Sequence, residues 1–166
     1  AGMADYPWWF GCDNTYSLKG VLATGRHELA ISTLRLLKDF SEKTGDNGRV
    51  VHEVSTNGAV FNPGNINETP HFASMIRTLF DWTGDTALVG EFYPFLQKGM
   101  KWLLEENDKD GNLLPDGFGM MEIHGLNSEI VDVAVYTQQA FMDMAALAAV
   151  MGRKDHQSAY QRKGEK

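Results

Sequence analysis

A glycine between two apolar, helix-like segments occurs three times in this chain, and it restricts the fold more than any other sequence feature. The glycines are Gly25, Gly84 and Gly152, in the stretches "TGRHELA", "TGDTALV" and "MGRKDHQ". Glycine readily takes the left-handed conformation in which many helices end, so the chain can reverse at once and begin another helix. The sequence therefore predicts a helical hairpin that is used three times.

Apolar residues recur at steps of three and four on both sides of these glycines, as they do on one face of a helix. The expected helices cover residues 15–25, 29–40, 68–82, 86–106 and 130–151, with a short sixth helix within residues 153–166. The segment 130–151 is apolar nearly all round, which predicts a helix that is buried on most sides. Few segments resemble strands, so we expect an all-α fold in a single domain, residues 1–166.

Two long polar segments join one predicted hairpin to the next. Residues 45–67 and 107–124 are rich in Gly, Asn, Asp and Pro, and they also carry aromatic residues and carboxylates. Loops of this length are uncommon in a compact helical protein unless they have a function. We therefore expect the functional residues at the end of the molecule where these loops lie, opposite to the short glycine turns.

Composition argues against several classes of partner. The net charge is −7 and the Lys and Arg residues are scattered, so no basic patch for nucleic acid is expected. No apolar run is long enough to suggest a membrane span, and "AGMADYPWWF" lacks the pattern of a signal peptide. Cys12 is the single cysteine, which excludes an intrachain disulfide. Localisation stays open between cytoplasm and periplasm.

Three stretches carry recognisable motifs: "WWFGCDN" at residues 8–14, "NETPHFASMIRTLFDWTGD" at residues 67–85 and "MKWLLEENDKDGNLLPDGFG" at residues 100–119. Together they resemble the six-hairpin glycosidases, the (α/α)6 toroids that include glucoamylases, glycogen-debranching glucosidases and trehalases. The first is similar to the family pattern W-F-G-R-D, with Asp13 retained and Cys12 where the family has Arg. The second is similar to D-A-T-P-x-F, with Glu68 in place of the Asp.

The resemblance implies both a fold and an activity. The helices would belong to an (α/α)6 toroid, of which this chain would supply about three of the six hairpins. The activity would be that of a glycoside hydrolase acting on α-linked, glucose-like sugars, with no cofactor and no metal ion. Five residues are expected to contact the carbohydrate substrate: Trp9, Asp13, Glu53, Glu68 and His124.

Glu122 is the first candidate for the general acid of such a site. Inverting glycosidases use one protonated carboxyl group as acid and one carboxylate as base. Burial of Glu122 between Met121 and Ile123 would raise its pKa, as a general acid requires. The layout of "EIHGLNS" is also similar to the acid-bearing turn of glucoamylases; Asp116 is the second candidate and Glu129 the third. The family's base lies in the last third of the barrel, so we expect this chain to be inactive alone.

Each candidate also has an ordinary structural interpretation. Glu122 and Glu129 could accept hydrogen bonds from backbone N–H groups at the start of a helix, and Asp13 could be an N-cap. The acidic stretch at residues 106–117 is similar to the start of a calcium-binding loop. Because Gly117 stands where such a loop needs its bidentate Glu, we interpret this stretch as an acidic turn.

Two other function classes remain open. A polysaccharide lyase or sugar epimerase of the same toroid fold would use a His or Tyr base, and His52, His71 and His124 are candidates. A non-catalytic helical-repeat scaffold would direct its acidic and aromatic loop residues outward rather than into one pocket. A half-toroid would also leave apolar faces of the helix at 130–151 open, so we expect copies of this chain to self-associate as a dimer or larger.

Overall fold

The computed structural model describes residues 5–119, 123 and 125–166. Helices make up 63% of the structure, which confirms the predicted all-α class. The described helices are α1 (Gly11–Ala23), α2 (His27–Thr44), α3 (Glu68–Thr83), α4 (Thr86–Asn107), α5 (Val131–Val150) and α6 (Lys154–Gly164). The described strands, each of two or three residues, are β1 (Trp9–Phe10), β2 (Glu53–Val54), β3 (Val60–Asn62), β4 (Asp116–Gly117) and β5 (Ser128–Glu129).

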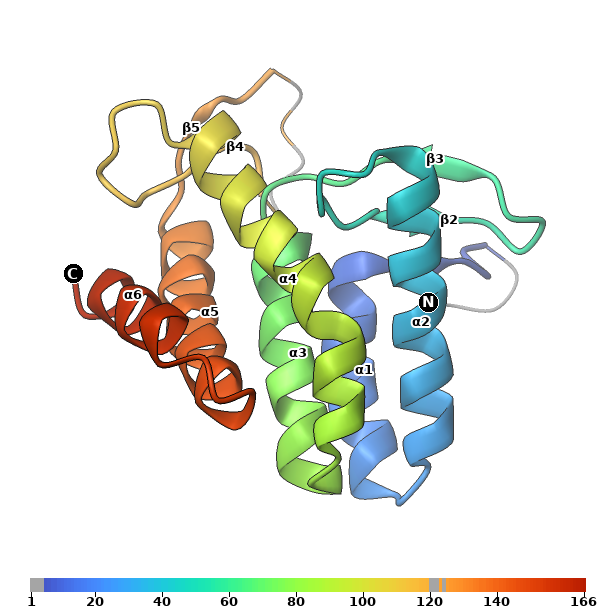
Figure 1. Ribbon diagram of the computed structural model, residues 1–166. Coiled ribbons are helices and arrows are strands. Elements are labelled where there is room, and N and C mark those ends of the chain that lie inside the picture. Colours follow the sequence, from blue (N-terminus) through green and yellow to red (C-terminus); the bar gives the residue numbers. More distant parts are fainter. Residues whose placement is uncertain (1–4, 120–122, 124) are drawn as a thin grey trace.

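A short turn with a left-handed glycine joins the two helices of each pair, as predicted. The backbone φ angle is 76° at Gly25, 64° at Gly84 and 68° at Gly152. After the second turn, the Asp85 carboxylate caps α4 by accepting a hydrogen bond of 2.8 Å from the N–H of Ala87. The turns lie at one end of the molecule and the long loops at the other, which is the arrangement that the sequence predicted (Figure 1).

The helices are arranged in two layers. In the first layer α3 lies between α1 and α5 (Figure 1). In the second layer α2 contacts α1 and α3, α4 contacts α3 and α5, and α6 packs on α5. Phe72 of α3 meets Phe92 and Phe95 of α4 at ring-centroid distances of 6.0 and 5.6 Å. Since α3 is covered by neighbours on several sides, its first turn is fixed in the middle of the loop end.

Two small antiparallel sheets lie at the loop end. The first has the order β1-β2-β3 and pairs Phe10 with Glu53 and Glu53 with Asn62. The second pairs Asp116 of β4 with Glu129 of β5. The first sheet carries the loop at residues 45–67 across the start of α1, and it thereby brings residue 53 close to residues 10–13.

One stripe of α5 is exposed, although the sequence predicted burial on most sides. Val131, Val135 and Met142 are 79%, 58% and 36% exposed, while the opposite face of the helix packs into the core. These residues are spaced by four and seven positions, so they lie along one side of the helix. Self-association through this stripe stays a prediction. Among the described helices, none combines the length and the hydropathy that a bilayer-spanning segment requires.

Gly48 is a position where the packing of loop and helix should not tolerate a side chain. Its φ is 84°, and a Cβ atom there would overlap the backbone nitrogen of Gly99 in α4. We expect Gly48→Ala to lower the free energy of unfolding by about 2–3 kcal/mol, because it combines a left-handed backbone with a steric overlap. Urea denaturation followed by far-UV circular dichroism measures this change.

Gly20 provides the matched control for Gly48. It lies within α1 with no atom close to its hypothetical Cβ. Gly20→Ala should therefore raise stability by about 0.5–1 kcal/mol, the usual advantage of Ala in a helix. Equal effects of the two substitutions would contradict the close approach of Gly48 to α4.

Candidate functional site

A polar cavity of about 320 Å³ lies at the loop end, where α1 and α3 begin. It is lined by Tyr6, Phe10, Asp13, His52, Glu53, Asn65, Asn67, Glu68 and Gly119. Three of the residues predicted to bind sugar are therefore together: Asp13 from the first turn of α1, Glu53 from β2 and Glu68 from the first turn of α3. They are far apart in the sequence, and the fold brings them to one wall.

Glu68 is held rigidly at the bottom of this cavity, with no exposed surface. Its Oε1 lies 2.7 Å from Nδ1 of His52, and its Oε2 accepts a hydrogen bond of 2.7 Å from the backbone N–H of Asn65. The amide orientation that satisfies both ends of Asn67 places its nitrogen 3.1 and 3.2 Å from the two carboxylate oxygens. A carboxylate with this many partners has one orientation, which is a requirement for a preorganised binding site.

His52 is fixed through its own backbone. Its N–H donates to the carbonyl of Asn62 at 3.0 Å, and its carbonyl accepts from the N–H of Gly11 at 2.7 Å. The edge of its ring faces Phe10, with ring centroids 5.7 Å apart. Because the imidazole also lies 4.0 Å from the carboxylate of Glu53, one side chain connects two of the acidic residues of the cavity.

The charge of the cavity is negative. It contains the carboxylates of Asp13, Glu53 and Glu68, and none of its described lining residues is Lys or Arg. The charge of Glu68 also acts on the thiol of Cys12. Burial is the main cause that raises the pKa of this thiol to about 12, and the charge of Glu68 is the second cause. Such a cavity favours ligands that donate hydrogen bonds and disfavours ligands that carry negative charge.

Aromatic side chains form one rim of the cavity. Trp8 stacks on Phe61 with ring centroids 4.9 Å apart and nearly parallel planes, and Tyr6 meets Trp8 edge-on at 6.1 Å. Phe61 is 62% exposed, so this aromatic group is open to solvent beside the acidic wall. Trp9, which the sequence analysis proposed as a sugar contact, is instead packed against the hydrophobic core and does not line the cavity.

The three candidates for the general acid are not all placed by the structure. Glu122 lies outside the described residues, as does His124, a proposed sugar contact. Gly119, three positions before Glu122 in the sequence, lines the cavity. Asp116 and Glu129 face each other as partners in the β4–β5 pair, and neither lines the cavity.

The ordinary interpretations of two acidic residues are wrong in detail. Glu129 does not belong to the first turn of α5, because it lies in β5 and its Oε1 accepts a hydrogen bond of 2.8 Å from the Asn112 amide. Asp13 is not the N-cap of α1, since that position belongs to Phe10. The carboxylate of Asp13 is exposed at the mouth of the cavity and is free of a structural role as a cap.

A second polar group lies between α1, α3 and α5. The ring of His71 contacts those of Tyr16 and Tyr136 at centroid distances of 5.3 and 4.0 Å, and the two hydroxyls are 3.3 Å apart. Burial lowers the pKa of His71 to about 4, although the carboxylates of Glu68 and Asp132 act in the opposite direction. The imidazole is therefore neutral at pH 7, which is the form that can accept a proton.

No metal centre is formed by the part of the chain that the structure describes. Among those residues, no group of three or more His, Cys, Asp and Glu side chains is arranged to hold an ion. In the acidic turn at residues 106–117, the carboxylates of Asp108 and Asp110 accept hydrogen bonds of 3.0 and 3.2 Å from the N–H of Asn112. These bonds stabilise the turn itself.

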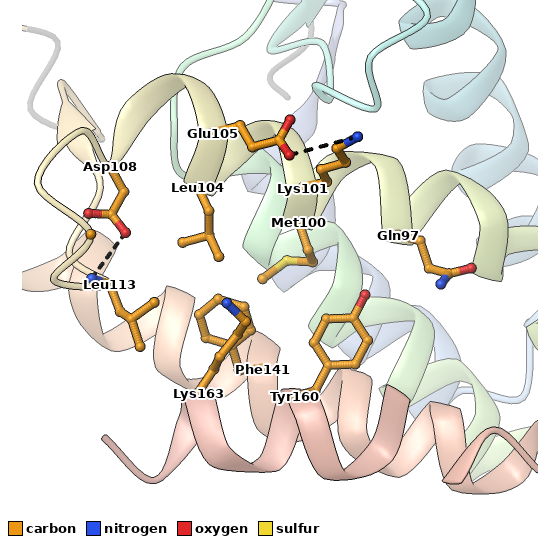
Figure 2. A pocket seen from close by; sticks show the side chains of 11 residues that line it. Gln97, Met100, Lys101, Leu104, Glu105, Asp108, Leu113, Phe141, Tyr160 and Lys163 are labelled. Atoms are coloured by element: carbon orange, nitrogen blue, oxygen red, sulfur yellow. Dashed lines mark hydrogen bonds and ion pairs between the residues drawn. The ribbon is translucent and has the colours of Figure 1, made fainter. Parts of the chain in front are cut away.

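A larger cavity of about 480 Å³ lies on the outer side of the molecule, between α4 and α6 (Figure 2). Aliphatic and aromatic side chains of α4, α5 and α6 face one another across it. Its carboxylates are already engaged: Glu105 pairs with Lys101 at 3.7 Å, and Asp108 accepts a hydrogen bond of 3.1 Å from the N–H of Leu113. This groove therefore lacks the convergent polar groups of the cavity at Glu68.

Sequence reasoning missed the amide side chains of the site. Asn65 and Asn67 lie in "NPGNINE", which was interpreted only as part of a polar loop, and His52 was considered only as a candidate base of a lyase or epimerase. A usable signal was present, because the two amides lie one and three positions before Glu68, at the start of a predicted helix. Comparisons with protein-family models, with curated proteins and with solved structures give no match to this chain.

Proposed function

We propose that this chain forms the sugar-binding and general-acid side of an inverting glycoside hydrolase site for α-linked, glucose-like sugars. One observation carries the proposal: three carboxylates that were expected to contact the sugar, Asp13, Glu53 and Glu68, line a single cavity. A non-catalytic scaffold gives no reason for acidic residues from three separate segments to converge. The amides of Asn65 and Asn67 add the kind of donors and acceptors that sugar hydroxyls require.

The arrangement of the helices supports a toroid as the parent architecture. Helices α1, α3 and α5 are consecutive neighbours that all start at the loop end, and α2, α4 and α6 pack behind them. In an (α/α)6 toroid the first set would be inner helices and the second set outer helices. We propose that the three hairpins are about half of such a ring, with the site at its loop-bearing opening.

The chemistry follows from what each group can do. The accessible carboxylates of Asp13 and Glu53 accept hydrogen bonds from sugar hydroxyls, and the rings of Tyr6 and Phe10 offer an apolar surface to a sugar face. Glu122 is the proposed acid, because it follows the lining residue Gly119 by three positions in a short apolar stretch. It would protonate the leaving oxygen while a base from outside this chain activates water.

A lyase or epimerase is the second candidate, and one observation favours it. The neutral imidazole of His71 beside the hydroxyls of Tyr16 and Tyr136 is the kind of group that removes a proton from a sugar carbon. A lyase that acts on a uronic acid would need a cationic or strongly donating partner for the sugar carboxylate. The acidic cavity offers the opposite charge, so hydrolysis of a neutral sugar is the better supported function.

The charge of the sugar is the property that tests this proposal. We expect glucose to bind with at least about tenfold higher affinity than glucuronic acid at pH 7 and low salt, because three carboxylates repel the uronate. Glucosamine, which is cationic, should bind at least as well as glucose. NMR titration of the chain with each monosaccharide gives the three dissociation constants and identifies the residues that respond.

Glu53→Gln is the matched variant for this measurement, since Glu53 is a partly exposed member of the acidic wall. It should reduce the difference in dissociation constant between glucose and glucuronic acid without abolishing the binding of glucose. Binding of glucuronic acid equal to or tighter than that of glucose would overturn the hydrolase proposal and favour the lyase.

A further inference from the structure

A second polar cavity, of about 270 Å³, lies beside the first, between the C-terminal end of α4 and the two long loops. The residues that matter in its lining are Arg49, Asn65, Trp102, Glu106, Asn107 and Asn127. None of these was among the residues expected to contact the substrate. The cavity adjoins the acidic one, because Asn65 lines both.

Two residues that line this cavity have a buried side-chain N–H group without a hydrogen-bond acceptor. Nε of Arg49 and Nδ2 of Asn65 are inaccessible, and neither has a hydrogen-bond partner among the described residues. Asn65 as a whole is only 6% exposed. Buried donors without acceptors are rare in folded proteins, because each one loses its bonds to water and gains nothing in return. An acceptor from a ligand would restore these bonds.

The Arg49 side chain is fixed rather than mobile. One of its terminal nitrogens donates to the carbonyl of Gly64, and its guanidinium lies over the ring of Trp102, 5.6 Å from the centroid. Burial lowers the pKa of Arg49, while the carboxylates of Glu68 and Glu106 act to raise it. The group thus cannot turn outward to solvent without losing these contacts.

The remaining lining residues define the class of ligand. Glu106 is an acceptor with a negative charge, and the amides of Asn107 and Asn127 both donate and accept. A ligand with several hydroxyls can use all of these groups, and the opposite charges of Arg49 and Glu106 give the lining no net preference for an anion or a cation. The volume is slightly below the range of about 300–1,000 Å³ for drug-sized ligands, which fits a single small unit such as one sugar ring.

We propose that this second cavity binds a further unit of the same neutral glycan whose terminal unit occupies the cavity at Glu68. The inference rests on the proposed function, because that function identifies the ligand as a sugar. Asn65 lies between the two units: its backbone N–H fixes Glu68 in the first cavity, and the residue also lines the second. The Arg49–Asn65 cavity thereby sets a preference for oligosaccharides over monosaccharides.

An NMR titration of the chain with maltotriose tests the proposal directly. The N–H signals of the Arg49 guanidinium and the Trp102 indole report on the second cavity, and the backbone signals of Asp13 and Gly119 report on the first. We expect both sets to shift together and to saturate at the same maltotriose concentration. The signal of Arg49 should shift most, because its Nε–H gains an acceptor.

Arg49→Met removes the donors and keeps an apolar stem of similar length. It should weaken maltotriose binding about tenfold and leave glucose binding unchanged. Arg26→Met is the control, since Arg26 is exposed in the turn between α1 and α2 and its replacement should have no effect on either ligand. Should Arg49→Met fail to fold, the titration of the unsubstituted chain decides alone.

The two cavities give separable outcomes. Shifts at Asp13 and Gly119 without any at Arg49 would contradict the binding of a second sugar unit in the Arg49–Asn65 cavity. They would leave the proposed function unaffected. Shifts at Arg49 and Trp102 alone would support sugar binding in the second cavity and contradict the acidic cavity as the site of the terminal unit. No shift at Arg49 at saturating maltotriose overturns the inference in every case.

Discussion

Replacing Glu122 by Gln is expected to lower kcat by about 10²–10⁴-fold in a protein where this chain is joined with a catalytic base. Gln has the same shape but cannot donate a proton to the leaving oxygen, and that donation occurs only in the transition state. KM should therefore change little. The measurement is the rate of hydrolysis of an α-linked glucose disaccharide at steady state.

A second substrate makes this experiment more specific. α-Glucosyl fluoride releases fluoride, a leaving group that needs little protonation, so Glu122→Gln should retain much more of its activity on the fluoride than on the disaccharide. A variant that had lost its fold or its sugar binding would fail on both substrates. The comparison thus separates the loss of an acid from the loss of the site.

Asp116→Asn and Glu129→Gln are the controls, and the structure gives the reason to expect small effects. Asp116 and Glu129 pair with each other across β4 and β5, away from the cavity. Glu129 is also exposed and bonded to the Asn112 amide. If either substitution lowers kcat as far as Glu122→Gln was expected to, the role of acid moves to that residue.

The helices could be predicted closely because their signals are local. The periodicity that predicted a helix at residues 68–82 corresponds to Glu68–Thr83, and the prediction at residues 86–106 corresponds to Thr86–Asn107. Both boundaries lie at Gly84 and Asp85, where a left-handed C-cap meets an N-cap within two residues. Such capping residues act within a few positions of themselves, so a single sequence is enough to identify them.

The start of the first helix and the β4–β5 pair depend on distant residues, and there the predictions fail. The predicted helix at residues 15–25 begins earlier, at Gly11, whose N–H is bonded to the carbonyl of His52. Glu129 was considered part of a helical first turn, but it lies in β5 because it pairs with Asp116. No local pattern in either segment specifies the partner.

The sequence selected carboxylates that line one cavity, whose role stays a prediction, but it did not identify the residues that support them. Asp13 and Glu68 were selected by motif, and both line the cavity. The residues that orient Glu68, His52 and Asn65, come from a loop whose path is set by the short sheet, so spacing alone could not show that His52 contacts this carboxylate. Trp9 shows the opposite error, since two adjacent indoles gave no indication of which ring packs inward.

Replacement of Glu68 by Leu is the other change with a large expected effect, in this case on folding. Glu68 is fully buried, and its carboxylate is 2.7 Å from both His52 Nδ1 and the N–H of Asn65. Removing one member of a buried, hydrogen-bonded pair typically lowers the free energy of unfolding by about 3–5 kcal/mol, because polar groups stay buried without the partner they had. We expect a loss in this range for Glu68→Leu in urea denaturation.

Glu53→Leu is the appropriate comparison for this effect. Glu53 belongs to the same cavity and contacts the same imidazole, but at 4.0 Å and with a side chain that is 25% exposed. Water can therefore replace much of its interaction, and the expected loss is at most about 1 kcal/mol. If the two substitutions cost the same, the rigid Glu68 carboxylate is not what holds the first turn of α3 against His52 and Asn65. The preorganised wall on which the binding proposal depends would then lose its physical basis.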